Sequence, residues 1–411
     1  MRIRRCAVAW LEPRELASFQ LSDLLAGGTG VVGRLAWFAH APHLGTAIEI
    51  DAAQVPVLGA LGAVDWIERE SLDRRFGADA VDALLASGLL LAEPGHGQAL
   101  ADADFRAHGW HAPDAVAHMA DRWEAVDGLK DMAEQDLDTN EGLLRQHGLP
   151  PPRDAGIGSP GAQLPLPAAG RDAFDDFLDS RVTCRNYDTA ASLPLATFSQ
   201  LLARVFGTRG VGHPAPGFDV AKRTSPSGGA LHPTDCFLIV QRVEGVPHGL
   251  YRYRAESHAL EPVVPQVAPP LPGDAGTRAL GDAAPRAWSA EELRAFARIA
   301  VAGQDYFADA PVLCILAPRF HRNFWKYRNH AKAYRVCVLD VGHLSQTLQL
   351  CATKAGLGPF ITSAINEIDL ERAFGMAAHA QGPLAICGFG KRADTLVESE
   401  FDPARRVWPR D

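Results

Sequence analysis

The sequence predicts an α+β protein in which helices surround a modest mixed sheet. Short apolar runs bounded by Gly or Pro predict strands at 235–241, 311–316 and 382–388. Longer segments, in which apolar residues recur at helical spacing, predict helices at 195–206 and 333–355. Both kinds of element occur in the same C-terminal region, so one domain is expected to contain them.

The bulk composition excludes several classes of protein. The chain has 411 residues, which exceeds a typical single domain, so we expect two. A net charge of −9 gives no basic excess for neutralising phosphates, so no nucleic-acid partner is predicted. Glu12 and Arg14 interrupt a start that otherwise looks like a signal peptide, and no run reaches the roughly 18 apolar residues of a membrane span.

The cysteines and histidines show no metal-binding or disulfide pattern. Seven cysteines lack a Cys-x-x-Cys pair and mostly lie in apolar runs, which predicts buried free thiols in a reducing cytoplasm. The fifteen histidines lack paired metal spacing, so neither a structural zinc site nor any metal ligand is predicted.

A Pro- and Gly-rich stretch divides the chain into three predicted parts. Residues 146–170 are interpreted as a linker, with an N-terminal module at 1–145 and a larger domain at 171–411. In the module, a helix around 80–85, a C-capping Gly88 and a strand after it resemble a small winged-helix-type fold. Such a module binds peptide or DNA, or only packs, and the lack of a basic recognition helix disfavours DNA.

The pattern of apolar residues predicts several further elements, most of them in the larger domain. Residues 333–355 are apolar on nearly every side, which predicts a fully buried helix in which Gly342 permits close helix approach. Gly356 is its expected C-cap. The remaining expectations are helices at 103–145, 171–181 and 290–302, a strand at 249–253, and a Pro-rich mobile excursion at 262–287.

Basic residues in two places suit a phosphate dianion. Arg181, Thr183 and Arg185 follow the helix at 171–181, and Lys391 and Arg392 follow the last strand. Arginine forks and a short hydroxyl are groups that bind phosphate. The alternative is a solvated charge cluster near helix ends.

The loop at 226–229 consists of small residues, a composition that suits contact with a planar ring. Its backbone can lie flat against the ring while a hydroxyl or peptide group meets ring heteroatoms. The alternative is an ordinary tight turn. The residues predicted to line the ring are Arg223, Pro226, Ser227, Gly228 and Gly229 in this loop, and Thr362 and Ser363 after the long helix.

Lys326 and Tyr327 are the candidate proton-transfer pair. They lie among aromatic residues next to the long helix, where desolvation would let the lysine act as a base and the phenol relay a proton. The alternative is a snorkelling lysine beside a core tyrosine. Asp340 and His343 share one face of the helix and are expected to make a structural hydrogen bond.

In this order, the motifs resemble the SagB-type dehydrogenases of the nitroreductase-like FMN flavoprotein superfamily. Arg181-x-Thr183-x-Arg185 resembles the family's Arg-Ser-x-Arg, with Thr183 at the serine position. Residues 223–233 resemble its Pro-Ser-Ala-Gly-Ala-Leu-Tyr-Pro element, with His232 at the tyrosine position. Further matching segments are Gly249-Leu-Tyr-Arg-Tyr, Lys326-Tyr327, Tyr334-Arg335, Asp340-x-Gly342-His343 and Gly388-x-Gly390.

The resemblance implies a nitroreductase-like fold at 171–411 and one FMN per active site at the interface of a homodimer. It implies that Arg181, Arg185, Lys391 and Arg392 hold the phosphate, that Thr183 and Ser227–Gly229 line the flavin, and that Lys326 is the base. The N-terminal module and linker resemble a branch of peptide-maturation dehydrogenases. That branch implies a ribosomally made precursor peptide as substrate and a cyclodehydratase complex as a further partner.

Three functional hypotheses remain open from the sequence. The first is an FMN-dependent dehydrogenase that oxidises an azoline ring of a modified peptide to an azole. The second is an NAD(P)H-dependent reductase of nitroaromatics or quinones, in which Lys326 and Tyr327 only pack. The third is a flavin-free scaffold of a peptide-modifying complex.

Overall fold

The structure is a computed structural model that describes residues 1–95, 97–153 and 164–408, and its contacts divide the chain into two compact units. Unit 1 comprises Met1–Arg122, Arg319–Cys337 and Ala377–Gly382, and unit 2 comprises the rest. The predicted linker overlaps 154–163, which lie outside the described residues. Residues 164–170 have no regular secondary structure.

Unit 1 begins with a three-stranded antiparallel sheet in the order β5-β1-β6. The predicted helix, glycine and strand are confirmed, because Gly88 has φ +79° and lies between α4 and β6. Glycine adopts this left-handed conformation without a Cβ clash, which ends the helix. The elements are β1 (Arg2–Arg5), α2 (Val55–Ala60), β5 (Ile67–Glu68), α3 (Arg69–Phe76), α4 (Ala78–Ala86) and β6 (Leu90–Ala92).

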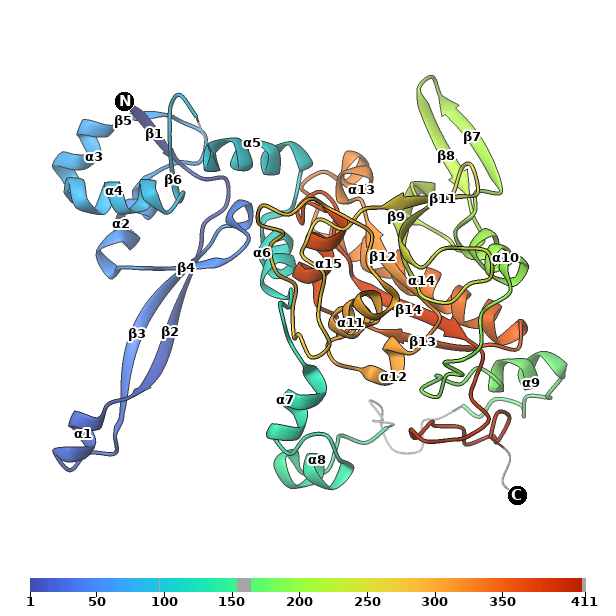
Figure 1. Ribbon diagram of the computed structural model, residues 1–411. Helices are drawn as coiled ribbons and strands as arrows, with labels where there is room; N and C mark the ends of the chain where they lie inside the picture. Colours follow the sequence, from blue (N-terminus) through green and yellow to red (C-terminus); the bar gives the residue numbers. More distant parts are fainter. Residues whose placement is uncertain (96, 154–163, 409–411) are drawn as a thin grey trace. The chain divides into compact units, whose positions relative to one another are not determined.

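A long hairpin is the second sheet of unit 1. β2 (Trp10–Phe19) and β3 (Val31–His40) pair over ten residues each, with α1 (Leu21–Leu25) between them and β4 (Ala47–Ile50) on the other edge of β3. Figure 1 shows the hairpin in blue with α1 at its end. Pro13 and several charged residues interrupt the alternation of apolar and polar residues in β2, so the hairpin has no clear strand pattern in the sequence.

An aromatic core joins the remaining pieces of unit 1. Phe105 and Trp110 pack with Phe320 and Phe324, which lie four residues apart on one face of α13 (Phe320–Tyr327). The predicted helix over 103–145 is broken into α5 (Gln98–His108), α6 (Ala112–Ala120), α7 (Gly128–Glu134) and α8 (Asn140–His147), of which the last two belong to unit 2.

Unit 2 is built on a six-stranded sheet in the order β11-β10-β9-β12-β14-β13. The α+β class is confirmed, although every described pairing in this sheet is antiparallel rather than mixed. The helical connection from β12 to β13 does give these two strands one direction, but β14 lies between them and opposes both. The strands are β9 (Thr234–Val240), β10 (Gly249–Arg254), β11 (Ala259–Val263), β12 (Val312–Pro318), β13 (Gly358–Thr362) and β14 (Ala385–Gly390).

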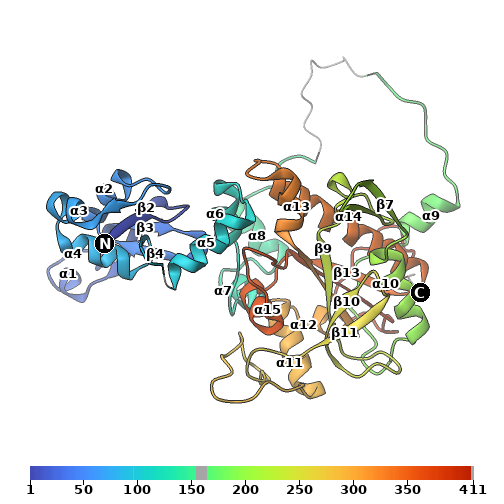
Figure 2. The ribbon, with the colours of Figure 1, turned by 90° about the horizontal axis from the view of Figure 1, so that it is seen from above.

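Helices cover both faces of this sheet, as Figures 1 and 2 show. Alternate residues of β12 point to opposite faces, so Leu313 and Ile315 enter one core and Cys314 and Leu316 the other. α11 (Ala290–Ala300) and α15 (Glu367–Phe374) cover the first face, and α10 (Leu195–Phe206) and α14 (Ala333–Lys354) the second. The predicted helices at 195–206 and 290–302 are thus confirmed.

One face of α14 is exposed in the single chain. Val341, Leu344 and Leu348 enter the core, whereas Val338 is 46% exposed and Leu339 55% exposed. A Cβ added to Gly342 would have nothing within 4 Å. The prediction of a fully buried helix with a close approach at Gly342 is therefore wrong for the single chain, because no element among the described residues of unit 2 packs on this apolar face. Gly356 has φ +72° and ends the helix as predicted.

Shorter elements complete unit 2. They are α9 (Ala173–Asp179), the hairpin of β7 (Gly210–Ala215) and β8 (Phe218–Lys222), and α12 (Asp305–Ala308). Asp172 accepts backbone hydrogen bonds from Phe174 and Asp175, which fixes the start of α9 close to the predicted one. All seven cysteines are free and six are buried, as predicted. Among the described residues, no helix is long and apolar enough to cross a membrane.

Candidate functional site

The loop from Pro226 to Pro233 has the most constrained backbone in the neighbourhood of the predicted site. Gly229, Ala230 and His232 have φ of 63°, 57° and 44°. For residues with a Cβ, this conformation costs about 1–2 kcal/mol each. Residues held in such conformations cluster at ligand-binding sites, so the loop is a candidate site on this ground.

Hydrogen bonds to α14 hold this loop in place. The Ser227 hydroxyl donates to Asp340 Oδ2 at 2.5 Å and accepts the His232 N–H at 3.0 Å. The hydroxyl of Ser225 lies 2.7 Å from that of Thr347, which is about two helical turns after Asp340 on α14. The Ser227 side chain is therefore engaged by the protein, and the backbone of Gly228 and Gly229 is the part of the loop that can approach a ring.

Asp340 is buried beneath the loop, with 4% of its surface exposed. Burial raises the pKa of its carboxyl group, and the hydrogen bonds from Ser227 and the Gly228 N–H together with the charge of His343 offset only part of that rise. The expected structural hydrogen bond of Asp340 is thus made, but to Ser227.

The predicted phosphate-binding cations differ in their partners. Arg181 donates to the Gln349 amide at 3.2 Å, and Arg185 donates to the Ser399 carbonyl at 2.9 Å, so both guanidinium groups have neutral partners here. Lys391 instead binds the carboxylate of Asp188 at 2.8 Å, and Arg392 binds that of Glu400.

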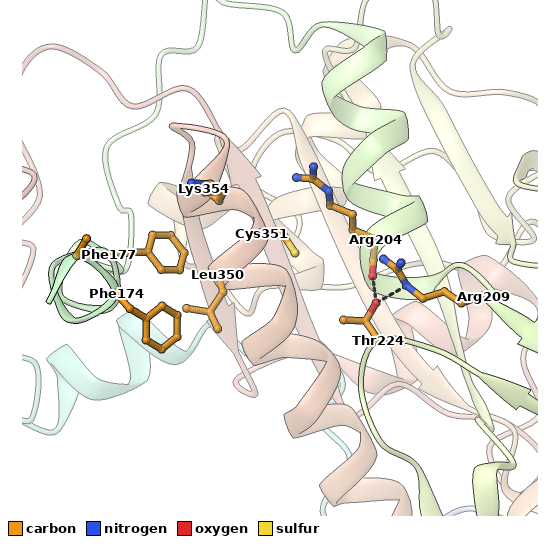
Figure 3. Close-up of a pocket in the computed structure, with 9 residues that line it drawn as sticks. Phe174, Phe177, Arg204, Arg209, Thr224, Leu350, Cys351 and Lys354 are labelled. Atoms are coloured by element: carbon orange, nitrogen blue, oxygen red, sulfur yellow. Dashed lines mark hydrogen bonds between the residues drawn. The ribbon is translucent and has the colours of Figure 1, made fainter.

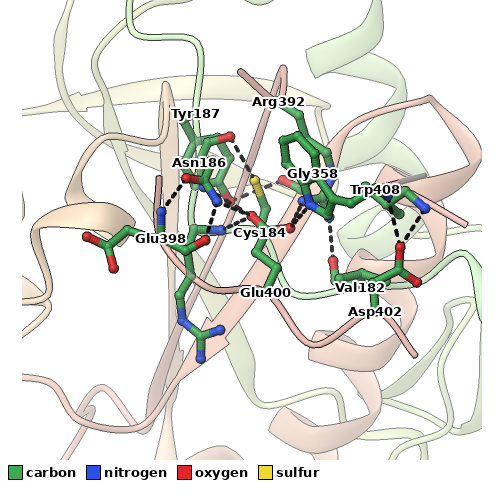
Figure 4. Close-up of polar contacts among 12 residues, drawn as sticks. Val182, Cys184, Asn186, Tyr187, Gly358, Arg392, Glu398, Glu400, Asp402 and Trp408 are labelled. Atoms are coloured by element: carbon green, nitrogen blue, oxygen red, sulfur yellow. Dashed lines mark hydrogen bonds and ion pairs between the residues drawn. The ribbon is translucent and has the colours of Figure 1, made fainter. Parts of the chain in front are cut away.

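Glu400 is the centre of a polar network that the sequence did not predict (Figure 4). It accepts the backbone N–H of Arg185 at 2.6 Å and that of Asn186 at 3.1 Å, the Trp408 indole N–H at 2.8 Å, and the guanidinium of Arg392. Burial alone would raise the pKa of Glu400, but these hydrogen bonds and the charge of Arg392 lower it. The network binds the C-terminal segment to residues 182–187.

Other predicted residues have mainly structural surroundings. Thr362 is buried and exchanges hydrogen bonds with Gln304, whereas Ser363 is exposed. Arg223 is buried and donates to the Thr234 carbonyl at 3.4 Å, Thr183 is half-buried, and Pro226 is exposed. The glycines of Gly388-x-Gly390 have a packing reason, because added Cβ atoms would lie 2.0 Å from Phe360 and 2.3 Å from Pro311.

Lys326 and Tyr327 lie on α13 in unit 1. Lys326 is exposed and Tyr327 half-buried, and the Lys326 ammonium lies 5.5 Å from the centre of the Tyr327 ring. The expected desolvation of Lys326 is not found in the single chain, because the apolar residues Phe320 and Phe324 point to the opposite face of the helix. Its role as a base stays a prediction.

The cavities of unit 2 lie beside the predicted residues. One of about 690 Å³ is walled by Phe174, Phe177 and Leu350 and edged by Arg204, Arg209 and Lys354 (Figure 3). Its described lining includes none of the predicted cofactor residues. A second of about 430 Å³ is lined in part by Gln304, which contacts Thr362, and by Tyr306, which lies beneath the guanidinium of Arg185.

The sequence profile of the Nitroreductase family matches residues 178–391, which is just over half of the chain. The chain belongs to the Nitroreductase family. The family's members are oxidoreductases, so the matched region is an oxidoreductase domain.

Individual proteins are similar to this chain over part of its length. The nitroreductase-like protein MJ1384 of Methanocaldococcus jannaschii is 24% identical over 232 residues, which cover 56% of this chain and 98% of that protein. The microcin B17-processing protein McbC of Escherichia coli is 26% identical over 209 residues, which cover 50% of this chain and 65% of McbC. A chain of the E. coli microcin synthetase McbBCD complex with truncated pro-MccB17 superposes with a TM-score of 0.49 at 18% identity, covering 71% of this chain and 97% of that one.

Proteins of the Nitroreductase family bind flavin, and unit 2 has groups that fit an FMN. The neutral partners of Arg181 and Arg185 leave their positive charges available to a phosphate. The left-handed backbone at Gly229 leaves a surface without a side chain for a planar ring. Lys391 and Arg392 fit less well, because a phosphate there would compete with Asp188 and Glu400.

Proposed function

We propose that this protein is an FMN-dependent dehydrogenase that oxidises a ribosomally made, modified peptide, converting an azoline ring to an azole. The similarity of half the chain to McbC, a microcin B17-processing protein, carries the proposal. Membership of the Nitroreductase family supports the flavin, and the Lys326-Tyr327 pair supports the removal of a ring proton.

The reaction removes two hydrogens from the ring. When bound, FMN supplies the acceptor for a hydride from one ring carbon. In this proposal Lys326 takes the proton from the neighbouring ring atom, and Tyr327 relays it to water. Arg181 and Arg185 hold the cofactor's phosphate, Gly228 and Gly229 support the ring, and dioxygen is the proposed terminal oxidant.

Residues 1–145 are proposed to hold the leader part of the peptide, and a cyclodehydratase that forms the azoline is the proposed partner. The exposed backbone at Pro226 and Gly229 supports access of a bulky chain to the ring. A cytoplasmic location, where thiols stay reduced, is consistent with the free cysteines.

The exposed face of α14 supports a homodimer. Val338, Leu339 and Gly342 form an apolar stripe that no described residue of unit 2 covers, and the same helix carries Asp340 beneath the loop. We expect Leu339→Asp to lower the mass measured by light scattering from that of a dimer to that of a monomer, and to lower the flavin content with it. Val64→Asp, at another exposed apolar side chain, is the control and should change neither. An unchanged dimer would exclude this interface.

The proposed chemistry is tested with the full-length protein and a candidate precursor peptide. We expect yellow protein with about one FMN per chain and a peptide whose mass, measured by mass spectrometry, falls by two hydrogens.

Two variants test the assigned residues. Lys326→Ala should keep the FMN and lower the oxidation rate by at least about a hundredfold, whereas Arg181→Ala should weaken FMN binding by about tenfold or more. Lys332→Ala and Arg171→Ala, at exposed positions, are the matched controls. Flavin-free wild-type protein, or full oxidation by Lys326→Ala, would contradict the proposal.

A second candidate is the reduction of small nitroaromatics or quinones with NAD(P)H. The exposure of Lys326 in the single chain favours it, because activation of a lysine as a base requires desolvation of its side chain. Rapid bleaching of the flavin absorbance by NADPH, with turnover of a quinone, would select this function over peptide oxidation.

A further inference from the structure

Three potential metal ligands meet in unit 1, and none of them is among the residues proposed for the flavin site. One ligand atom each of Asp104, His108 and His379 lies within 4.8 Å of the others. No other such group of three occurs among the described residues. The proposed function assigns none of these side chains a role.

α5 presents two of the ligands on one face. Asp104 and His108 are separated by four residues, which places their side chains one above the other on a helix. The ring of His108 donates from Nδ1 to the backbone carbonyl of Asp104 at 2.7 Å. This hydrogen bond fixes the tautomer, so the lone pair of Nε2 is available to a metal ion.

His379 is held against this face by its neighbours. The indole N–H of Trp110 donates to the His379 carbonyl at 2.8 Å, which fixes the backbone. The His379 ring lies 5.0 Å from that of His108 and is nearly perpendicular to it, and Phe105 contacts it edge-on at 6.4 Å. His379 Nε2 is 2.5 Å from Asp104 Oδ2, and only 17% of the His379 side chain is exposed.

We propose that Asp104, His108 and His379 form a binding site for a divalent transition-metal ion such as Zn²⁺. Ligand atoms about 2.0–2.2 Å from a tetrahedral ion lie about 3.3 Å from one another. The three ligand atoms here lie within 4.8 Å of one another, and the closest pair is 2.5 Å apart, so small side-chain movements suffice to reach that geometry. Two imidazoles and a carboxylate are a common zinc ligand set, in which water fills the fourth position. His321, whose ring lies 5.6 Å from that of His108, is the candidate fourth ligand.

The metal ion would act as a structural clip within unit 1. Asp104 and His379 are 275 residues apart in the sequence, so the ion would fix the segment Ala377–Gly382 onto α5. A ligand that binds only the folded state raises its stability. The competing explanation is a plain Asp–His hydrogen bond, of which His213 and Asp219 at 2.6 Å on the exposed β7–β8 hairpin are an example.

The test uses the full-length protein after removal of metals with a chelator. Calorimetric titration with Zn²⁺ should show one tight site per chain, and titration with Co²⁺ should give the visible absorption of a four-coordinate ion. His108→Gln and His379→Gln should each weaken binding by at least about tenfold, and His213→Gln, which disrupts a two-member pair, should leave it unchanged. Zn²⁺ should also raise the thermal unfolding temperature of the wild type and not that of His379→Gln.

Asp104→Asn serves if a histidine variant fails to fold, since Asp104 is exposed and the substitution preserves shape. Affinity that is equal in the wild type and in Asp104→Asn, or affected as much by His213→Gln, would overturn the proposal. Absence of saturable binding to the wild type would overturn it as well. Flavin content should not change in any of these variants, so the result is independent of the proposed function.

Discussion

Two buried carboxyl groups of unit 2, those of Asp340 and Glu400, lie beside predicted cofactor residues and have pKa values shifted in opposite directions. Burial raises the pKa of Asp340, which receives the Ser227 hydroxyl and the Gly228 N–H. The pKa of Glu400 is lowered, because the indole of Trp408, the backbone of Arg185, Asn186 and the guanidinium of Arg392 outweigh its desolvation.

The difference shows that the number and charge of the donors decide whether a buried carboxylate is stabilised. Glu400 has a cation and several N–H donors, and its side chain is fully buried. Such a network is complete within the chain and holds the C-terminal segment in place. Asp340 has few donors, so its ionised form remains costly, as is common at sites where a ligand or substrate completes the surroundings.

The largest expected effect comes from breaking the complete network. Glu400→Gln leaves Arg392 buried without its anion, so we expect the free energy of unfolding of unit 2 to fall by about 3 kcal/mol. Urea denaturation of the purified variant measures this loss. Lys391→Met is the control, because the Lys391 side chain is exposed in its pair with Asp188 and its loss should cost much less stability. Equal losses in the two variants would show that burial does not distinguish these ion pairs.

A smaller effect is expected at Asp340, and it should depend on pH. A carboxyl group whose pKa is higher in the folded state binds its proton more tightly there, so its contribution to stability is largest at low pH. It falls as the pH rises above the ordinary aspartate value of about 3.9. Asp340→Asn should therefore gain stability relative to the wild type between pH 4 and pH 7, as measured by urea denaturation at both values.

The contribution of Glu400 to stability should depend on pH in the opposite direction to that of Asp340. Its lowered pKa means that its stabilisation is present above about pH 4.3 and is lost as the pH falls through the folded-state value. Glu400→Gln should therefore lie furthest below the wild type near pH 7 and approach it in acid. A pH trend of the same sign in both variants would show that the two carboxyl groups do not differ as described.

Local sequence patterns predicted those parts of the fold that local chemistry determines. The helix at 195–206 has apolar residues at helical spacing and was placed at its observed bounds, and glycines with positive φ end helices at Gly88 and Gly356. The exposure of Leu339 could not be predicted, because the sequence pattern of an apolar helix face is the same whether that face packs on the protein's own core or on a partner. The sheet is antiparallel at this edge because β14 lies between β12 and β13, and no local sequence pattern indicates that position.

The candidate site was predictable as a set of residues but not as a set of contacts. Ser227 and Asp340 were both identified, yet they are 113 residues apart and their hydrogen bond has no signal in a single sequence. Glu400 was missed, because its partners Arg185 and Asn186 lie more than two hundred residues earlier. The sequence contains the four-residue spacing of Asp104 and His108, but only the folded chain brings His379 close to them.

The position of α14 has a thermodynamic consequence. Its inner side bears the carboxyl group that fixes the loop proposed to support the flavin ring, and its outer side is the apolar stripe proposed to meet a second copy. Two binding events that depend on one rigid element influence each other equally, since the coupling free energy between two sites is reciprocal. Retention of the cofactor would then depend on protein concentration, and a colourless preparation would be as much a sign of dilution as of an unsuitable expression host.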